Sequence, residues 1–285
     1  MNLAYSPKTA ARRAALPIGI FDSGVGGLTV VRQIHRVLPN EDLIYLGDTA
    51  RVPYGNKSPG TVIRYSCEDT HFLLERNVKA VVVACNTASA WALATLERQF
   101  ALPVFGVILP GANAALAATR TGRIGVIGTK ATMRSQAYSK AILARRDDVQ
   151  VFTAACPLLV PLVEEDWHDH VVTRRVLREY LAPLLRRRID TLVLGCTHYP
   201  LLKNVIRQVV GEKIALVDSA ESCAKFVKDR LGALHLLNTR RRRRGLIRPF
   251  VTDEVDRFDE LAARFLGHKT EPAEKVELKA GDVNP

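Results

Sequence analysis

The chain has 285 residues, of which 47% are hydrophobic and 25% are charged. This composition is typical of a globular protein and excludes a disordered, collagen-like or coiled-coil protein, and the length allows one large domain or two smaller ones. The formal net charge is +12, and six of the positive charges lie in one stretch, Arg240–Arg244 together with Arg248. The excess basicity is therefore partly local.

The cysteines and the N-terminus indicate an intracellular setting. The chain has five cysteines, an odd number, and no pair has CxxC spacing. We therefore predict neither a disulfide framework nor a zinc site or other metal site. The N-terminal residues lack a signal-peptide core, and prolines and glycines interrupt the uncharged segment between Arg98 and Arg120. We predict a cytoplasmic protein without membrane contact.

Short β-branched runs alternate with longer amphipathic segments along the chain, which predicts an α/β fold with mostly parallel sheets covered by helices. The expected helices include Leu28–Val37, Thr61–Glu75, Val171–Arg187 and Asp253–Leu266, the last with Thr252 as N-cap and Gly267 at its end. The expected strands are Ile18–Phe21, Leu43–Leu46, Ala80–Ala84, Val104–Val107, Ile124–Ile127, Val149–Thr153, Thr191–Leu194, Ala215–Val217 and a short strand at Arg248–Val251.

The two halves of the chain echo each other. The first reads IGIFDSG and then VVVACNTAS, and the second reads IGVIGTK and then LVLGCTHYP. This predicts two pseudo-symmetric α/β domains with an active site in the cleft between them. We place the first domain at 17–109 plus 218–267 and the second at 110–217. Residues 1–16 and 268–285 are expected to be weakly ordered tails.

The strongest chemical signal is a pair of cysteine loops. Cys85 ends a predicted strand before Asn86–Ser89, and Cys196 ends another before Thr197–Pro200. Ligands of parallel α/β sheets bind outside the carboxyl ends of the strands, and a helix N-terminus there favours a thiolate. A small buried cysteine is the alternative interpretation of each position, but two cysteines at matching places favour reactive thiols.

Three further loops supply polar groups to the same edge. Asp22-Ser23 precedes a glycine-rich turn that matches neither the dinucleotide-binding motif nor a P-loop, and its carboxylate suits an ammonium group or an acid–base relay; a helix N-cap is the alternative. Tyr54-Gly55 would line a cleft or form a plain turn. Of the pair Glu164-Glu165, one side chain would reach the cleft, unless both lie on a solvated helix start.

The arginine run Arg240–Arg244 is the feature that would suit a nucleic-acid partner, because arginine runs bind phosphates. No aromatic residues are interleaved with it and no recognition motif accompanies it. A solvated surface stretch is the favoured interpretation, and nucleic acid is not expected as a partner.

Together these motifs resemble those of the glutamate racemases, in the cofactor-independent aspartate/glutamate racemase superfamily. The matching pieces are GIFDSGVGGLTV, YLGDTARVPYG, VVVACNTASA, IGVIGTKATMRS, CPLLVPLVEE, LVLGCTHYPLL and VDSAES, in the order of the family, from about Gly19 to Ser222.

The resemblance implies interconversion of L- and D-glutamate without a cofactor, supplying D-glutamate for peptidoglycan. It implies that Cys85 and Cys196 are the two acid/base residues, with Cys85 acting on D-glutamate and Cys196 on L-glutamate. It also implies a proton relay through Asp22, His198 and one glutamate of the pair, for which we favour Glu165. The substrate-contacting positions that it implies are Asp22, Ser23, Tyr54, Gly55, Asn86, Thr87, Thr197 and His198. We expect a monomer or a homodimer.

Three other functions would explain parts of the same sequence. The first is a related racemase that acts on aspartate or another amino acid. The second is a cysteine hydrolase with Cys85 as nucleophile and His198 as base, which leaves Cys196 without a role. The third is a non-enzymatic protein that contacts nucleic acid through Arg240–Arg244.

Overall fold

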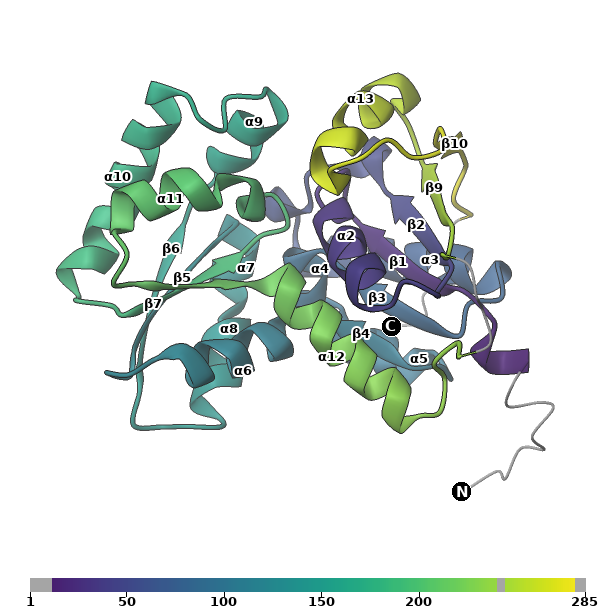
Figure 1. The fold of residues 1–285 in the computed structure, drawn as a ribbon, viewed down its shortest axis with the longest axis horizontal. Helices are drawn as coiled ribbons and strands as arrows, with labels where there is room; N and C mark the ends of the chain where they lie inside the picture. The colour runs from purple at the N-terminus through teal and green to yellow at the C-terminus, as the bar shows by residue number, and fades with distance from the viewer. Residues whose placement is uncertain (1–11, 240–243, 280–285) are drawn as a thin grey trace.

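The computed structural model describes residues 12–239 and 244–279 and contains two parallel β-sheets (Figure 1). One sheet has six strands in the order β10-β9-β2-β1-β3-β4, and the other has four in the order β6-β5-β7-β8. Every strand pair is parallel. The expected α/β fold with helix-covered parallel sheets is confirmed.

The strands of the first sheet are β1 (Ile18–Asp22), β2 (Leu43–Gly47), β3 (Ala80–Val83), β4 (Val104–Gly106), β9 (Ile247–Val251) and β10 (Glu274–Lys275). Those of the second are β5 (Arg123–Gly128), β6 (Gln150–Ala155), β7 (Thr191–Gly195) and β8 (Ala215–Asp218). The expected strands agree with these bounds to within two residues at each end.

The α-helices are α2 (Leu28–Val37), α3 (Pro59–Glu75), α4 (Asn86–Trp91), α5 (Leu93–Gln99), α6 (Ile108–Ala118), α7 (Lys130–Ser135), α8 (Ala137–Leu143), α9 (Leu159–Glu164), α10 (Val171–Arg186), α11 (Lys203–Val210), α12 (Ser219–Ala233) and α13 (Val255–Leu266). Short 3₁₀ helices are η1 (Thr49–Arg51), η2 (Tyr54–Asn56) and η3 (Tyr199–Leu202).

The strand orders show why two segments distant in sequence carry related loops. The order β2-β1-β3-β4 in the first sheet is repeated as β6-β5-β7-β8 in the second. In each sheet, the chain runs from the first strand of the repeat towards one edge and later from the third strand towards the other edge. The first and third strands are therefore neighbours. Loops that leave the carboxyl ends of two such strands in opposite directions form a crevice. β3 and β7 are equivalent strands, so Cys85 and Cys196 follow equivalent strand ends.

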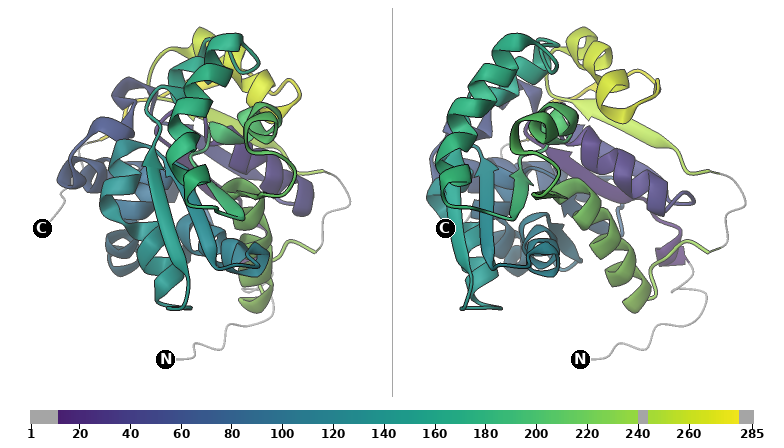
Figure 2. Two further views of the ribbon diagram at one scale, coloured as in Figure 1. Left: turned by 90° about the vertical axis from the view of Figure 1, so that its left-hand side faces the viewer. Right: turned by 60° about the vertical axis from the view of Figure 1, so that its left-hand side comes forward.

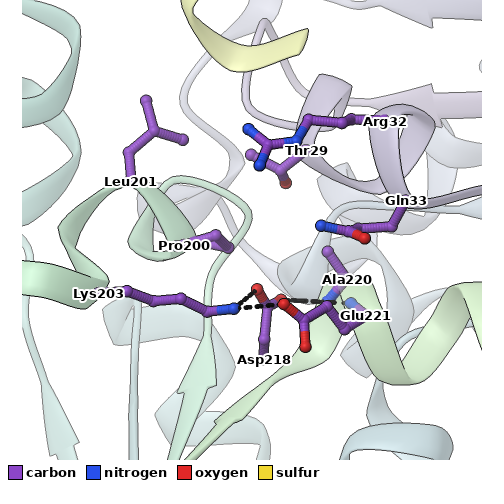
Figure 3. A pocket seen from close by; sticks show the side chains of 9 residues that line it. All are labelled: Thr29, Arg32, Gln33, Pro200, Leu201, Lys203, Asp218, Ala220 and Glu221. Atoms are coloured by element: carbon purple, nitrogen blue, oxygen red, sulfur yellow. Dashed lines mark hydrogen bonds and ion pairs between the residues drawn. The ribbon is translucent and has the colours of Figure 1, made fainter. Parts of the chain in front are cut away.

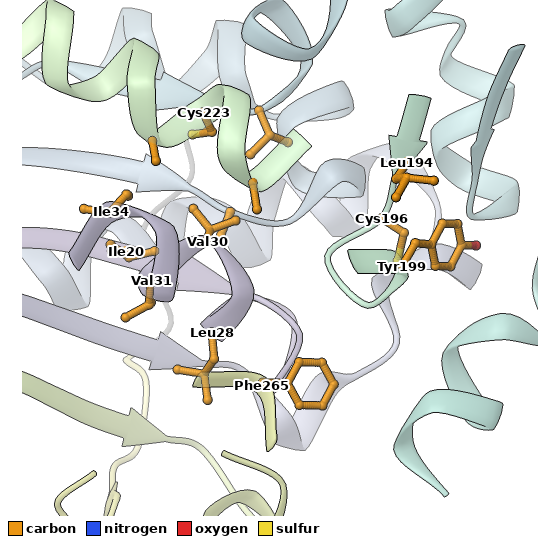
Figure 4. Close-up of a cluster of buried hydrophobic side chains, with 14 of the residues drawn as sticks. Ile20, Leu28, Val30, Val31, Ile34, Leu194, Cys196, Tyr199, Cys223 and Phe265 are labelled. Atoms are coloured by element: carbon orange, nitrogen blue, oxygen red, sulfur yellow. The ribbon is translucent and has the colours of Figure 1, made fainter. Parts of the chain in front are cut away.

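One apolar cluster joins the two halves. Its side chains come from β1 and α2, from α12 and α13, and from the end of β7 (Figure 4). Helix α12 contacts both α2 and α6, and the right-hand view of Figure 2 shows it in light green beside the purple α2. Separate clusters fill the outer faces: one lies between the first sheet and α3, α4 and α5, and another between the second sheet and α6 and α8. Burying apolar surface on both faces explains the near-continuous hydrophobic strands.

Three expectations concern the C-terminal part of the chain: the cap of α13, the tail after His268 and the arginine run. Thr252 does not cap α13: its hydroxyl donates to Asp48 Oδ1 at 3.0 Å, and Glu254 occupies the N-cap position. The tail after His268 is not wholly loose, because β10 pairs with β9 and Val276 N donates to Val251 O at 2.8 Å. Apart from Arg244, the arginine run lies outside the described residues. Among the described residues, no helix is long and apolar enough to cross a membrane.

Candidate active site

Cys85 lies where β3 meets α4, with 6% of its surface exposed. Its sulfur accepts a hydrogen bond from Ala88 N at 3.5 Å and lies 3.8 Å from Ser23 Oγ. Burial raises the pKa of the Cys85 thiol well above its ordinary value, and the neighbouring charge of Asp22 raises it further. These surroundings favour the protonated thiol of Cys85.

Cys196 follows β7 and has a different partner. Its sulfur lies 3.9 Å from His198 Nδ1, and His198 Nε2 lies 2.8 Å from Glu164 Oε1. Burial opposes a charged ring, but the hydrogen bonds with Cys196 and Glu164 outweigh it and raise the pKa of His198 to about 10. An imidazolium beside a sulfur favours the thiolate form. The two sulfurs therefore have opposite electrostatic surroundings.

Both sulfurs line one small cavity of about 30 Å³. Seven of the eight expected substrate-contacting residues line it as well: Ser23, Tyr54, Gly55, Asn86, Thr87, Thr197 and His198. A wider cavity of about 260 Å³ shares Val52, Pro53, Gly55, Thr129 and Val160 with it and has Lys130 and Glu164 on its rim. The larger space therefore leads into the smaller one.

Asp22 is the expected substrate-contacting residue that does not line the cavity. Its Oδ2 accepts hydrogen bonds from Gly27 N at 3.0 Å and Gly24 N at 3.3 Å, so the amides of the glycine turn bind this carboxylate and not an outside anion. Among the described residues, its Oδ1 has no hydrogen-bond partner. Burial raises the pKa of Asp22 to about 6, although the charge of His198 opposes the shift.

The glycine turn also has a packing role. A side chain at Gly26 would come within 2.5 Å of the His198 ring and of Thr197 Oγ1. Thr29 Oγ1 lies 2.9 Å from Thr197 O, and it can donate there across the two halves. The turn after β1 is therefore shaped to let the Cys196 loop approach closely.

The choice of Glu165 as the cleft-facing glutamate is wrong. Glu164 ends α9 and reaches His198, whereas Glu165 pairs with Arg257 at 2.7 Å and its side chain is 65% exposed. Consecutive residues on a helix point about 100° apart, so only one of the pair can face inward. Burial opposes ionisation, but the hydrogen bond and charge of His198 lower the pKa of Glu164.

Thr129 is a cavity residue that the sequence analysis missed. It follows β5 as Ser23 follows β1, so the internal repeat contained the signal. Its hydroxyl lies 2.9 Å from Thr87 Oγ1 and 3.0 Å from Thr132 Oγ1. Tyr138 also comes from the second half and donates to Asn86 Oδ1 at 2.8 Å. Polar contacts thus join the two walls of the cavity.

A separate pocket of about 90 Å³ lies between α2, η3 and the start of α12 (Figure 3). In it, Lys203 Nζ lies 2.6 Å from both Asp218 Oδ2 and Glu221 Oε1. It shares no lining residue with the cysteine cavity. In the described part of the chain, no group of three or more His, Cys, Asp or Glu side chains could hold a metal ion. All five cysteines are free and buried.

Comparison with known proteins points to one family. The family model for Asp/Glu/Hydantoin racemase matches residues 18–227. A glutamate racemase from Geobacter metallireducens is 54% identical over 263 residues, covering 92% of this chain and 97% of the relative.

Two solved structures agree with the fold. A glutamate racemase isoform from Bacillus anthracis superposes with a TM-score of 0.89 at 41% identity, covering 92% of this chain and 98% of that one. A glutamate racemase from Francisella tularensis in complex with D-glutamate superposes with a TM-score of 0.86 at 36% identity, covering 94% and 100%.

Proposed function

Because the chain belongs to the Asp/Glu/Hydantoin racemase family, we propose that it is a glutamate racemase, an isomerase that interconverts L- and D-glutamate. The observation that carries this proposal is the pair of thiols. They follow equivalent strands of two repeated sheets and line one cavity. Inverting a stereocentre needs a base on one side of the Cα atom and an acid on the other, and this arrangement supplies both.

We propose that the reaction is a proton transfer through two thiols. With L-glutamate, the Cys196 thiolate removes the Cα proton, the electron pair of the C–H bond moves into the carboxylate, and the Cys85 thiol returns its own proton to the opposite face. The reverse reaction begins with Cys85 as thiolate and Cys196 as thiol. The electrostatic difference between the two sulfurs supports L-glutamate as the substrate of the resting form.

His198 and Asp22 are proposed to adjust the charge at the sulfurs during turnover. His198 holds a positive charge beside Cys196 and is itself held by Glu164. Asp22 lies close enough for its charge to act on both Cys85 and His198. The net charge of the site stays the same during turnover, but the negative charge moves from one sulfur to the other, and these groups can stabilise it at either position.

The polar residues of the cavity are proposed to bind the substrate. Asn86, Thr87 and Thr197 offer amide and hydroxyl groups from the two walls, and Ser23 lies beside Cys85. Thr129 adds a hydroxyl from the second half. Donors that hold the α-carboxylate would also stabilise the carbanionic transition state, whose charge spreads onto it. The D-glutamate product would serve peptidoglycan synthesis in the cytoplasm, and no added cofactor would be needed.

The cysteine hydrolase has less support. That function needs His198 beside Cys85, but His198 contacts Cys196 and Glu164. A racemase for another amino acid differs only in its substrate, so aspartate must be tested beside glutamate.

Circular dichroism of L- or D-glutamate incubated with the purified protein tests the function directly. We expect the signal of either enantiomer to decay to zero without added pyridoxal phosphate. In D₂O, deuterium should appear at Cα of glutamate. Faster racemisation of aspartate than of glutamate, or no racemisation of either, would contradict the proposal.

A further inference from the structure

A buried group of ionisable side chains supports the cavity wall at η2. We call it the Asp69 cluster, and it consists of Asp48, Arg51, Tyr54, Glu68 and Asp69. Asp48, Tyr54 and Asp69 have no exposed surface, and Glu68 is 7% exposed. Tyr54 belongs to the cavity lining, so the cluster connects directly to the substrate site.

The cluster holds more acids than bases. Arg51 Nε lies 2.6 Å from Asp48 Oδ2, and its other nitrogens bind Glu68 and, at 3.2 Å, Asp69 Oδ1. Arg64 adds a contact of 4.0 Å to Glu68 from an exposed position. Three ionised carboxylates around the partly exposed guanidinium of Arg51 would leave an excess negative charge, which is costly for the buried carboxylates.

The contacts of the Tyr54 hydroxyl indicate which of Asp48 and Asp69 is protonated. Tyr54 Oη lies 2.5 Å from Asp48 Oδ2 and 3.0 Å from Asp69 Oδ2. A hydroxyl has one proton and can donate to only one of these carboxyl groups. Asp48 has the shorter contact and also accepts from Thr252 and Arg51, so it is the better stabilised anion.

We propose that Asp69 stays protonated in the folded protein and donates to Tyr54 Oη, so that the chain Asp69–Tyr54–Asp48 fixes the cavity wall at η2. Burial supports this assignment because it raises the pKa of Asp69 well above its ordinary value, and the charge of Asp48 adds to the shift while Arg51 opposes it. The other titratable groups that face Asp69 are Tyr54, Glu68, Cys67 and Tyr45.

Asp69 is a positioning residue in this proposal, since it does not line the cavity. Through Tyr54 it holds Gly55, whose backbone packs against Thr129: a Cβ atom at Gly55 would lie 2.9 Å from Thr129 Cβ. A shift of η2 would therefore change the wall that faces Thr129 across the cavity.

The first test measures the melting temperature of wild-type protein and Asp69→Asn from pH 5 to pH 8. Asparagine mimics the neutral acid. The carboxyl of Asp69 ionises in the unfolded chain near pH 4, so the wild type loses a proton on unfolding and becomes less stable as pH rises. The melting temperature of D69N minus that of wild type should therefore increase by about 3 °C or more across this range. A constant difference would overturn the proposal.

Asp190→Asn is the control for this test. Asp190 accepts hydrogen bonds from Thr119 and Thr121 and from backbone amides, which hold its pKa well below the ordinary value against burial. It is ionised in both states above pH 5, so its difference from wild type should stay constant. If D69N does not fold, ¹³C-aspartate NMR of wild-type protein is used. One carboxyl carbon should then keep the chemical shift of a protonated acid at pH 7.

The second test rests on the proposed function and compares KM and kcat for glutamate in D69N and Asp69→Leu. Asparagine can still donate to Tyr54, and KM should stay within about twofold of wild type; leucine cannot, and KM should rise about tenfold with a smaller change in kcat. Equal KM values for both variants would refute the positioning role. An inactive wild type would contradict the proposed function and leave the stability result standing.

Discussion

Cys85 and Cys196 follow equivalent strands of two repeated sheets, yet they have opposite surroundings. Cys85 is buried near the carboxylate of Asp22, and its burial and then this charge raise the pKa of its thiol. Cys196 lies beside His198, whose own pKa is raised to about 10. The sheet topology thus sets where the sulfurs lie, and the side chains of the following loops set the charge that lies beside each sulfur.

The largest effect is expected from removing either thiol. Cys85→Ala and Cys196→Ala should each lower kcat for glutamate racemisation by about 10³-fold or more, because each direction of turnover needs both an acid and a base. Circular dichroism of the substrate measures the rate. Cys223→Ala is the matched control: Cys223 is fully buried on α12, outside the cavity, and its loss should leave the rate nearly unchanged. Substantial activity in either cavity variant would rule out the two-thiol reaction.

The next effect concerns the positive charge beside Cys196. Glu164→Gln removes the carboxylate that helps to raise the pKa of His198. The ring should then lose its proton at a lower pH, and kcat/KM for L-glutamate should fall roughly 10- to 100-fold, most strongly at alkaline pH. The pH profile of the L-to-D reaction measures this.

Glu165→Gln provides the control for that experiment, one residue away. Glu165 pairs with Arg257 at the surface, and such pairs contribute little. Its variant should match wild type in rate and in pH profile. Equal losses in the two variants would show that the contact between Glu164 and His198 is not what matters.

A third experiment concerns the carboxylate beside Cys85. The pKa of Asp22 is raised to about 6, so the stability associated with its proton is present below about pH 4 and is lost as pH rises through 6. Asp22→Asn keeps an oxygen for the amides of the glycine turn and avoids this loss. Relative to wild type, its free energy of unfolding should increase by about 3 kcal/mol between pH 4 and pH 8.

The same variant should be slower, because the charge that acts on Cys85 and His198 is gone. Denaturant unfolding at the two pH values measures the first effect, and racemisation at pH 8 the second. A variant that is both as unstable and as active as wild type at pH 8 would contradict the role of Asp22.

The sequence was sufficient to predict the parts of this site that depend on strands. Strongly hydrophobic runs marked β3 and β7, and with them the ends at which Cys85 and Cys196 lie. It could not separate Glu164 from Glu165, because that choice depends on the helical rotation at which α9 ends. The boundaries of the two domains stay a prediction.

Two other features needed the three-dimensional arrangement. Thr129 was within reach of the internal repeat, but only the shared strand order makes it the counterpart of the β1 loop. The partners of Asp69 come from η1, η2 and the segment after β2, so nothing in the pattern of α3 alone marks this residue as part of the wall. Long-range contacts of this kind leave no periodicity in the sequence.

The smallest effect concerns a contact between α8 and the residue after Cys85. Tyr138 in α8 donates to Asn86 Oδ1, and Asn86 Nδ2 lies 3.5 Å from Ser219 Oγ, so the orientation of this amide is fixed from the second half. Tyr138→Phe keeps the buried ring and removes the hydroxyl. If Asn86 binds substrate, KM should rise about fivefold with little change in kcat, since a single hydrogen bond is lost. Tyr180→Phe, on α10 outside the cavity, should leave KM unchanged, and an equal rise in both variants would show that the effect is not specific to Asn86.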